Sequence, residues 1–166
     1  RVRDEEEDEE LERLLKDKLK LSQGKVLYNS GGFESQSIKG RIEPSDFPQV
    51  INFILDNKFD DGRKRLLFVL MTFLSSVGYD FKSIEEILSI WNKKQESPLR
   101  ENYVSAQLNW LNSQGKSISP PNYDNSNYYS GLGIPKDIID KDINNFRSPK
   151  IKNPLHFCLT LQSKQK

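Results

Sequence analysis

The feature that most constrains the fold is a run of nine residues, Leu66–Leu74, in which only Thr72 is polar. The run lies between Gly62 and Gly78, and glycine is common at the residues that flank helices. A helix that is apolar on nearly every side has to be surrounded by other elements of the fold. The run therefore predicts a central, buried helix and a fold that is built around it.

Helical patterns also occur on both sides of this run. We expect further helices to begin at Ser45 or Asp46, at Ser83, at Ser97, and after Pro135 and Pro154. Ser83 and Glu86 have the spacing of a capping box, and the helix from Ser97 is expected to last until Gly115. No stretch shows sustained alternation of apolar and polar residues, so strands should be minor. These patterns predict a mainly α protein.

Composition divides the chain into segments. Residues 1–21 are an acidic N-terminal segment that ends in four leucines with the spacing of a short amphipathic helix, and residues 22–44 have the composition of a linker. We expect a single helical domain over residues 45–160 and a tail over 161–166. Proline, glycine and asparagine are frequent after Gly115, so the C-terminal third should be rich in loops.

The net charge of +1 hides an asymmetry along the 166 residues. Residues 1–12 contain two arginines and eight acidic groups, so the rest of the chain carries a charge of +7. A moderately basic body is suited to partners that carry phosphates. No apolar run approaches the length of a membrane span, and with a single cysteine no disulfide can form within the chain. We therefore expect a protein of the reducing cytoplasm, without membrane contact.

The sequence contains no Walker-type phosphate loop, no nucleophile elbow and no HExxH pair, so no catalytic residues are predicted. His156 is the only histidine and Cys158 the only cysteine, too few for a metal site. His156 is interpreted either as a structural residue or as a contact to a phosphate or a partner. Cys158 lies between Phe157 and Leu159 and is interpreted as a small buried hydrophobic residue.

Three cations, Arg63, Lys64 and Arg65, fall in the first turn predicted for the central helix. A helix start carries a partial positive charge, so a cation there costs about 0.3–1 kcal/mol. The cluster therefore indicates an anionic ligand, whose phosphate oxygens the two arginines could bind through paired N–H donors. The alternative is that Asp60 or Asp61 caps the helix while the basic side chains point into solvent.

Aromatic residues add a second indication of nucleotide binding. Arg100, Tyr103, Gln107 and Trp110 would share one flank of the helix predicted from Ser97. An arginine beside an aromatic ring can hold a phosphate while the ring stacks on a base. The alternative is that Tyr103 and Trp110 are aromatic residues at the rim of the core. Trp91 is interpreted either as a packed core residue or as a ring that a nucleotide can reach.

Six short motifs occur in the order found in a known family. The chain resembles the C-terminal domain of the large subunit of archaeal and eukaryotic DNA primases over roughly residues 46–158. The motifs are Asp46–Ile51, Asp61–Arg63, Val77–Tyr79 followed by Ile90–Trp91, Leu99–Tyr103, Ser119–Tyr123 and Lys152–His156.

The chain departs from this family at two ligands of its iron–sulfur cluster. In the family one cysteine follows the Phe-Pro motif and another follows the Pro-Pro motif, whereas Val50 and Tyr123 occupy these places here. A single remaining cysteine cannot hold such a cluster. The resemblance therefore implies a cluster-free domain without a metal cofactor, in which hydrophobic packing around Val50, Tyr123 and Cys158 replaces the cluster.

The resemblance also implies a function. A cluster-free domain of this kind is similar to a non-catalytic subunit of a heterotrimeric archaeal DNA primase, with the catalytic and large primase subunits as partners. It would hold the initiating ATP or GTP by its 5′ triphosphate beside the single-stranded DNA template, and so lower the entropic cost of the first bond. Arg63 matches the family's arginine, and the resemblance places Lys58, Arg65, Trp91 and Tyr103 beside it.

Two alternatives to nucleotide binding remain at this point. One is a helical docking module of a replication complex, in which the acidic segment or the amphipathic helix recruits a partner protein. The other is a general DNA-binding helical domain. A triphosphate site should prefer ATP or GTP to a monophosphate, whereas a DNA-binding domain should show a steep dependence on salt.

Overall fold

The computed structural model describes residues 38–165, which contain six α-helices, two short 3₁₀ helices and no strand. The elements are η1 (Pro44–Asp46), α2 (Gln49–Asp56), α3 (Arg63–Ser76), α4 (Phe81–Lys94), α5 (Glu101–Asn112), η2 (Ser130–Leu132), α6 (Lys136–Ile143) and α7 (Pro154–Lys164). The expected mainly α fold is confirmed. The acidic segment 1–21 and most of the expected linker lie outside the described residues.

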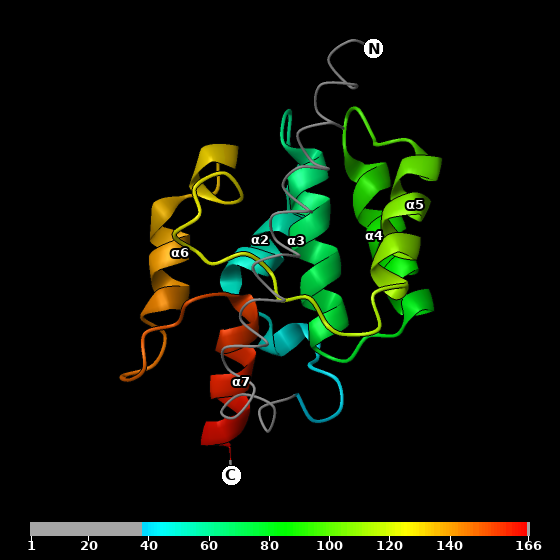
Figure 1. Ribbon diagram of the computed structural model, residues 1–166. Coiled ribbons are helices and arrows are strands. Elements are labelled where there is room, and N and C mark those ends of the chain that lie inside the picture. Colours follow the sequence, from blue (N-terminus) through cyan, green and yellow to red (C-terminus); the bar gives the residue numbers. More distant parts are fainter. Residues whose placement is uncertain (1–37, 166) are drawn as a thin grey trace. The chain divides into compact units, whose positions relative to one another are not determined.

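α3 is the centre of the helical domain (Figure 1). α4 and α5 pack against it and against each other, while α7 packs on α3 from another direction and α2 packs on α6. Short connections make α3, α4 and α5 successively antiparallel. Consequently the first turns of α3 and α5 lie at the same end of this group as the last turn of α4, as Figure 1 shows.

The apolar run of α3 is buried as expected. Every residue of Leu66–Leu74 is at most 1% exposed, including Thr72, whose hydroxyl donates to the carbonyl oxygen of Phe68 at 2.7 Å. The helix ends at Ser76, and Gly78 then adopts a φ of +99°. At the other end Gly62 is the N-cap residue with a φ of +76°. Both glycines therefore have a left-handed backbone conformation that favours glycine, and Gly78 has it just after the end of the helix.

Two predicted helix starts are wrong by a few residues. α4 begins earlier than its expected capping box, because the carboxylate of Asp80 accepts from the backbone N–H of Ser83 at 2.8 Å. α5 begins later than the expected cap at Ser97. The side chain of Asn92 binds both the N–H and the carbonyl oxygen of Leu99, each at 2.8 Å, and so holds the preceding loop outside the helix.

The start of α2 also differs from the prediction. Ser45 and Asp46 belong to η1, and α2 begins at Gln49 after an N-cap residue that makes no side-chain capping bond. The cap comes instead from α6. The two carboxylate oxygens of Asp142 accept from the backbone N–H groups of Gln49 at 2.8 Å and Val50 at 2.9 Å.

The C-terminal part of the domain contains a long connection and two helices. The connection between α5 and α6 holds η2 and the buried side chains of Tyr123, Tyr128 and Tyr129. The Tyr129 hydroxyl donates to the carbonyl oxygen of Pro121 at 2.6 Å. α7 continues to Lys164, beyond the expected domain end at residue 160. Across residues 38–165, each helix is too short or too polar to cross a membrane.

Candidate nucleotide-binding site

The predicted basic residues gather at the end of the α3–α4–α5 group where α3 and α5 begin. Lys58 is exposed in the loop before α3, Arg63 and Arg65 lie in the first turn of α3, and Arg100 is the exposed N-cap residue of α5. Tyr103 lies in the first turn of α5, partly exposed. These are five of the six predicted site residues, and all five are at least partly exposed at this end of the α3–α4–α5 group.

Arg63 has a different local role from the one expected. Its Nη1 donates to the backbone carbonyl oxygens of Phe59 at 2.9 Å and Asp60 at 2.6 Å. Its Nε is buried and makes no hydrogen bond. The guanidinium therefore closes the loop that leads into α3 through Nη1, and a contact of Arg63 with a phosphate stays a prediction. Asp61 does not cap the helix either, because its carboxylate accepts from the adjacent N–H of Gly62.

Lys64 joins the cluster, although it was not among the predicted ligands. Its side chain is only 7% exposed, and its Nζ lies 4.9 Å from the centre of the Tyr103 ring. A cation at this distance from an aromatic face is stabilised by the ring quadrupole. A sequence signal was present: Lys64 lies one turn before Phe68 and two turns before Met71, both buried, so it continues a buried stripe.

Trp91 is a core residue. Its side chain is 0% exposed, and its Nε1 donates to the carbonyl oxygen of Ile54 at 2.9 Å. The interpretation of Trp91 as a packed residue is therefore confirmed, and its assignment to the nucleotide site is wrong. The physical reason is its place on the inward stripe of α4, beside the fully buried Leu88.

Two amide side chains of α4 and its C-terminus position the loops around the cluster. Gln95 is 3% exposed; its Oε1 accepts from the N–H of Phe59 at 2.8 Å, and its Nε2 donates to the carbonyl oxygen of Asn57 at 3.2 Å. These bonds flank Lys58. Asn92 holds the loop before Arg100 through its two bonds to Leu99. Nothing in the sequence distinguishes these amides from exposed ones.

A polar acceptor lies one helical turn beyond Tyr103. The Oε1 of Gln107 is buried and accepts no hydrogen bond, while the residue as a whole is partly exposed. A buried amide oxygen without a donor is costly, and a ligand that supplies an N–H group would remove this cost. Gln107 therefore adds a hydrogen-bonding group to the aromatic flank of α5.

The positions that carry cysteines in the resembled family come together elsewhere in the domain. The N–H of Val50 and the hydroxyl of Tyr123 both donate to the same oxygen, Oδ2 of Asp142, at 2.9 and 3.1 Å. Cys158 is fully buried and close enough for Asp142 to affect its pKa. We call Val50, Tyr123, Asp142 and Cys158 the carboxylate junction. Val50, Tyr123 and Cys158 are buried, as the expected hydrophobic packing requires, and a buried carboxylate that the sequence analysis did not anticipate connects the elements.

Burial dominates the titration of this junction. It raises the pKa of Asp142, although the N–H groups of Val50 and Gln49 and the Tyr123 hydroxyl act in the opposite direction. Burial and the neighbouring carboxylate raise the pKa of Tyr123. Among residues 38–165 no group of three or more His, Cys, Asp or Glu side chains could hold a metal ion. These residues do not fit a four-thiolate cluster, and a cofactor-free protein stays a prediction.

We expect Cys158 to be unreactive toward a thiol-specific reagent in the native protein. Burial raises its pKa to about 12, and the thiolate is the reactive form of cysteine. Because this is the only cysteine in the chain, the absorbance of the released chromophore reports on it alone. Reaction should be complete after unfolding in guanidinium chloride. Rapid reaction of the native protein would contradict the buried position of Cys158.

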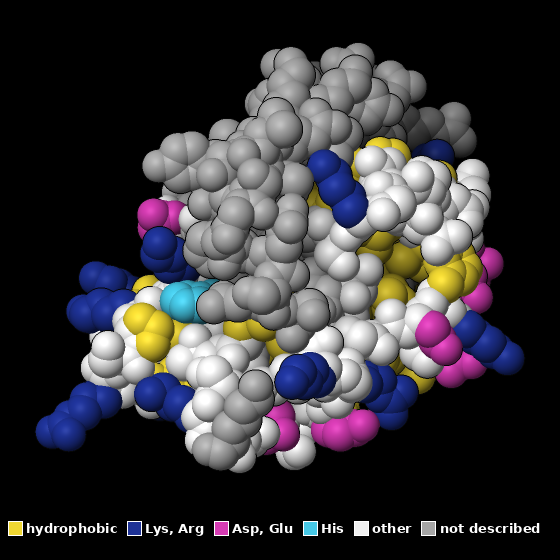
Figure 2. Space-filling view, turned by 60° about the horizontal axis from the view of Figure 1, so that its bottom comes forward, with side chains coloured by type: hydrophobic (Ala, Val, Ile, Leu, Met, Phe, Trp, Pro, Cys, Tyr) yellow, Lys and Arg dark blue, Asp and Glu magenta, His cyan; other side chains and the backbone are white. Residues whose placement is uncertain are grey.

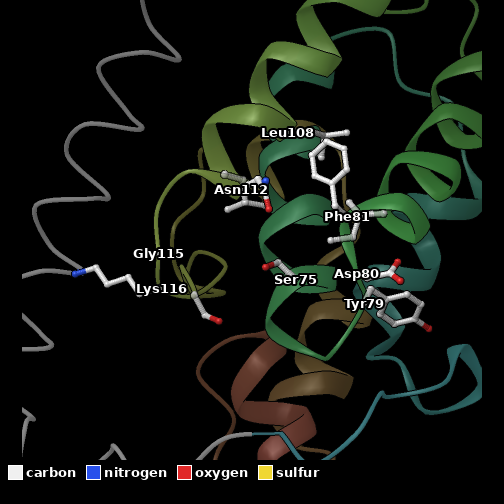
Figure 3. A pocket seen from close by; sticks show the side chains of 11 residues that line it. Ser75, Tyr79, Asp80, Phe81, Leu108, Asn112, Gly115 and Lys116 are labelled. Carbon is white, nitrogen blue, oxygen red and sulfur yellow. The ribbon is translucent and has the colours of Figure 1, made fainter.

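A cavity of about 360 Å³ lies at the opposite end of the α3–α4–α5 group. Its lining includes Phe81, Leu108 and Asn112 (Figure 3), and no predicted site residue. Figure 3 also shows the Lys116 side chain extending away from the other labelled residues. The cavity thus lacks a convergent set of cations and is not the predicted phosphate site.

Comparison of the chain with protein-family models, with curated proteins and with solved structures gave no match.

Proposed function

We propose that this protein is a non-catalytic nucleotide-binding subunit, with its site at the start of α3 and α5. The observation that carries this proposal is the placement of Lys64 over the Tyr103 ring, with Arg65 and Arg100 at the same end of the domain. Cations and an aromatic face in one place suit a phosphate chain attached to a base.

The residues of the cluster other than the buried Lys64 each have a proposed role. Arg65 and Arg100, with Lys58 from the preceding loop, neutralise the triphosphate of ATP or GTP. Tyr103 stacks on the base, while Gln107 accepts a hydrogen bond from its edge. Arg63 acts indirectly, because its bonds to the carbonyl oxygens of the loop fix the backbone beside the first turn of α3.

The particular function that we propose is support of primer initiation in a DNA primase. The protein would correspond to PriX, the non-catalytic third primase subunit of crenarchaea, and would assemble with the catalytic and large subunits. The order of the six motifs supports this, as does the convergence of Val50 and Tyr123 on one oxygen of Asp142. Holding the first nucleotide beside the template lowers the entropic barrier to bond formation. A docking module without nucleotide binding is the alternative.

We expect Arg65→Ala to weaken ATP binding to the isolated chain at least tenfold, because a charge-assisted hydrogen bond contributes about 1.5–3 kcal/mol. Titration with labelled ATP measures the effect. Lys82→Ala is the control. It removes an exposed cation from the first turn of α4, away from the proposed site, and should bind ATP like the wild type. Arg63→Ala is less informative, since it also releases the loop before α3.

Two comparisons decide the proposal. AMP should bind at least tenfold more weakly than ATP, because it lacks the phosphates that the arginines contact. In the assembled primase, Arg65→Ala should impair dinucleotide synthesis and leave extension of a supplied primer nearly unchanged. Equal affinity for ATP and AMP, or equal loss of initiation and extension, would favour the docking module.

A further inference from the structure

A second basic surface lies on the connection between α6 and α7 and on the first turn of α7. Arg147, Lys150 and Lys152 are all exposed on this connection. We call these three cations, with Phe146 and His156, the α6–α7 surface. Figure 2 shows Lys and Arg side chains around the one histidine of the chain on this face of the molecule. None of these cations belongs to the nucleotide site proposed above.

No ion pair of the described residues involves these cations, although the exposed Asp124 follows Tyr123, whose backbone N–H donates to the carbonyl oxygen of Lys152 at 2.8 Å. The sequence from Asn144 to Lys164 contains neither aspartate nor glutamate. On the adjoining helix, Asp142 is 1% exposed and its oxygens accept hydrogen bonds from α2 and Tyr123, so it points into the domain. Within residues 38–165, the one ion pair between side chains joins Arg41 and Glu43. The cations of the α6–α7 surface therefore leave a positive field directed to solvent.

An aromatic ring lies beside these cations. Phe146 is partly exposed; its ring centre is 5.4 Å from that of Phe157, and the Nζ of Lys164 lies 5.8 Å from it. The packing against Phe157 fixes the ring from one side. A fixed, partly exposed ring among cations is the arrangement on which unpaired bases stack while the cations bind the phosphates between them. This combination favours single-stranded nucleic acid over other polyanions.

His156 adds a hydrogen-bond donor. Its Nδ1 accepts from the N–H of Lys152 at 3.0 Å, so in the neutral ring Nε2 carries the proton. Burial and the nearby Lys152 lower its pKa, which keeps the ring neutral at pH 7. The residue lies in the first turn of α7, whose cap is the Asn153 side chain bonded to the His156 N–H at 2.8 Å. A neutral Nε2–H can donate to a phosphate oxygen.

We infer that the α6–α7 surface binds the backbone of single-stranded nucleic acid, with Arg147, Lys150 and Lys152 on the phosphates and Phe146 against a base. The inference rests on the proposed function only in identifying this strand as the template. The nucleotide would bind to α3 and α5 and the strand to the α6–α7 connection, so the two sites can be tested separately.

The test measures binding of a fluorescent oligothymidylate to the full chain by anisotropy, over a series of salt concentrations. We expect the triple variant Arg147→Gln, Lys150→Gln, Lys152→Gln to bind at least tenfold more weakly. The slope of log affinity against log salt should become shallower by about 2, since each phosphate contact on a single strand contributes about 0.7. The matched control, Lys82→Gln, Lys93→Gln, Lys116→Gln, removes three exposed cations elsewhere and should bind within twofold of the wild type.

A second variant tests the aromatic contact. Phe146→Leu keeps an apolar side chain against Phe157 and should weaken oligothymidylate binding severalfold without changing the salt slope, because stacking releases no counterions. Circular dichroism and thermal unfolding establish that each variant is folded. A slope that is unchanged in the triple variant, or an equal loss in the control, would overturn the inference.

Further measurements test other polyanions as ligands, and they separate failure of this inference from failure of the proposed function. Duplex DNA and anionic phosphatidylserine vesicles should bind more weakly than oligothymidylate at the same salt; tighter binding of either would overturn the assignment to single strands. The triple variant should keep wild-type affinity for ATP, while Arg65→Ala should keep wild-type affinity for oligothymidylate. It is possible to observe that neither the wild type nor any variant binds ATP, while the triple variant no longer binds oligothymidylate. In that case the proposed function fails and this inference stands.

Discussion

Replacing Asp142 with alanine is expected to lower the free energy of unfolding by about 3 kcal/mol. The variant leaves the backbone N–H groups of Gln49 and Val50 and the hydroxyl of Tyr123 without their acceptor. A buried donor that loses an ionised acceptor costs about 1.5–3 kcal/mol. Burial raises the pKa of Asp142, which shows that its charge is desolvated in the wild type. This desolvation offsets part of the stability that the three hydrogen bonds contribute. The expected loss of stability is therefore smaller than the sum that three hydrogen bonds to a charged acceptor would contribute.

Denaturant unfolding followed by circular dichroism measures this loss, and the melting temperature should fall by roughly 8–15 °C. Asp140→Ala is the matched control, because Asp140 lies on the same helix, is partly exposed and does not belong to the carboxylate junction; we expect a change below about 0.5 kcal/mol. Asp142→Asn should fall between the two, since an amide oxygen replaces one acceptor only. Equal stability of the two alanine variants would show that the junction does not hold α2 to α6.

The junction also shows why helix starts were harder to predict than helix faces. The inward stripe of α4 follows from residues three and four apart, and Ile84, Leu88 and Trp91 are buried as expected. The cap of α2 depends on Asp142, which lies 93 residues away from Gln49. A pattern within one helix cannot contain such a partner, and local capping preference favours Ser45 and Asp46 instead.

The candidate site shows the same division between pattern and tertiary contact. The sequence indicates that cations precede the apolar run, and helix periodicity places Tyr103 on a flank of α5. It does not show which way each side chain turns. Arg63 bonds to the backbone before it, whereas Lys64 reaches across to another helix. Trp91 fits both a packed and an open position by spacing, and only the burial of its ring in the core decides between them.

Gly78→Ala is the second substitution with a large expected effect, again about 3 kcal/mol. Gly78 has a φ of +99°, which costs a residue with a Cβ atom about 1–2 kcal/mol. A Cβ here would also overlap the carbonyl oxygen of Gly40 and lie 2.9 Å from the Cα of Arg41, and such overpacking costs about 1–3 kcal/mol. These backbone atoms cannot move freely, because the Ile42 N–H bonds to the carbonyl oxygen of Val77 at 3.0 Å.

Gly115→Ala separates the two contributions. Gly115 has a φ of +61°, but a Cβ there would meet no atom within 4 Å, so only the conformational cost applies. We expect a loss of about 1 kcal/mol for Gly115→Ala, measured by denaturant unfolding beside Gly78→Ala. The difference between the variants then reports how firmly residues 40–42 are held against the turn after α3. If both variants lose the same stability, the close approach of Gly40 to Gly78 contributes nothing, and φ alone explains the glycine.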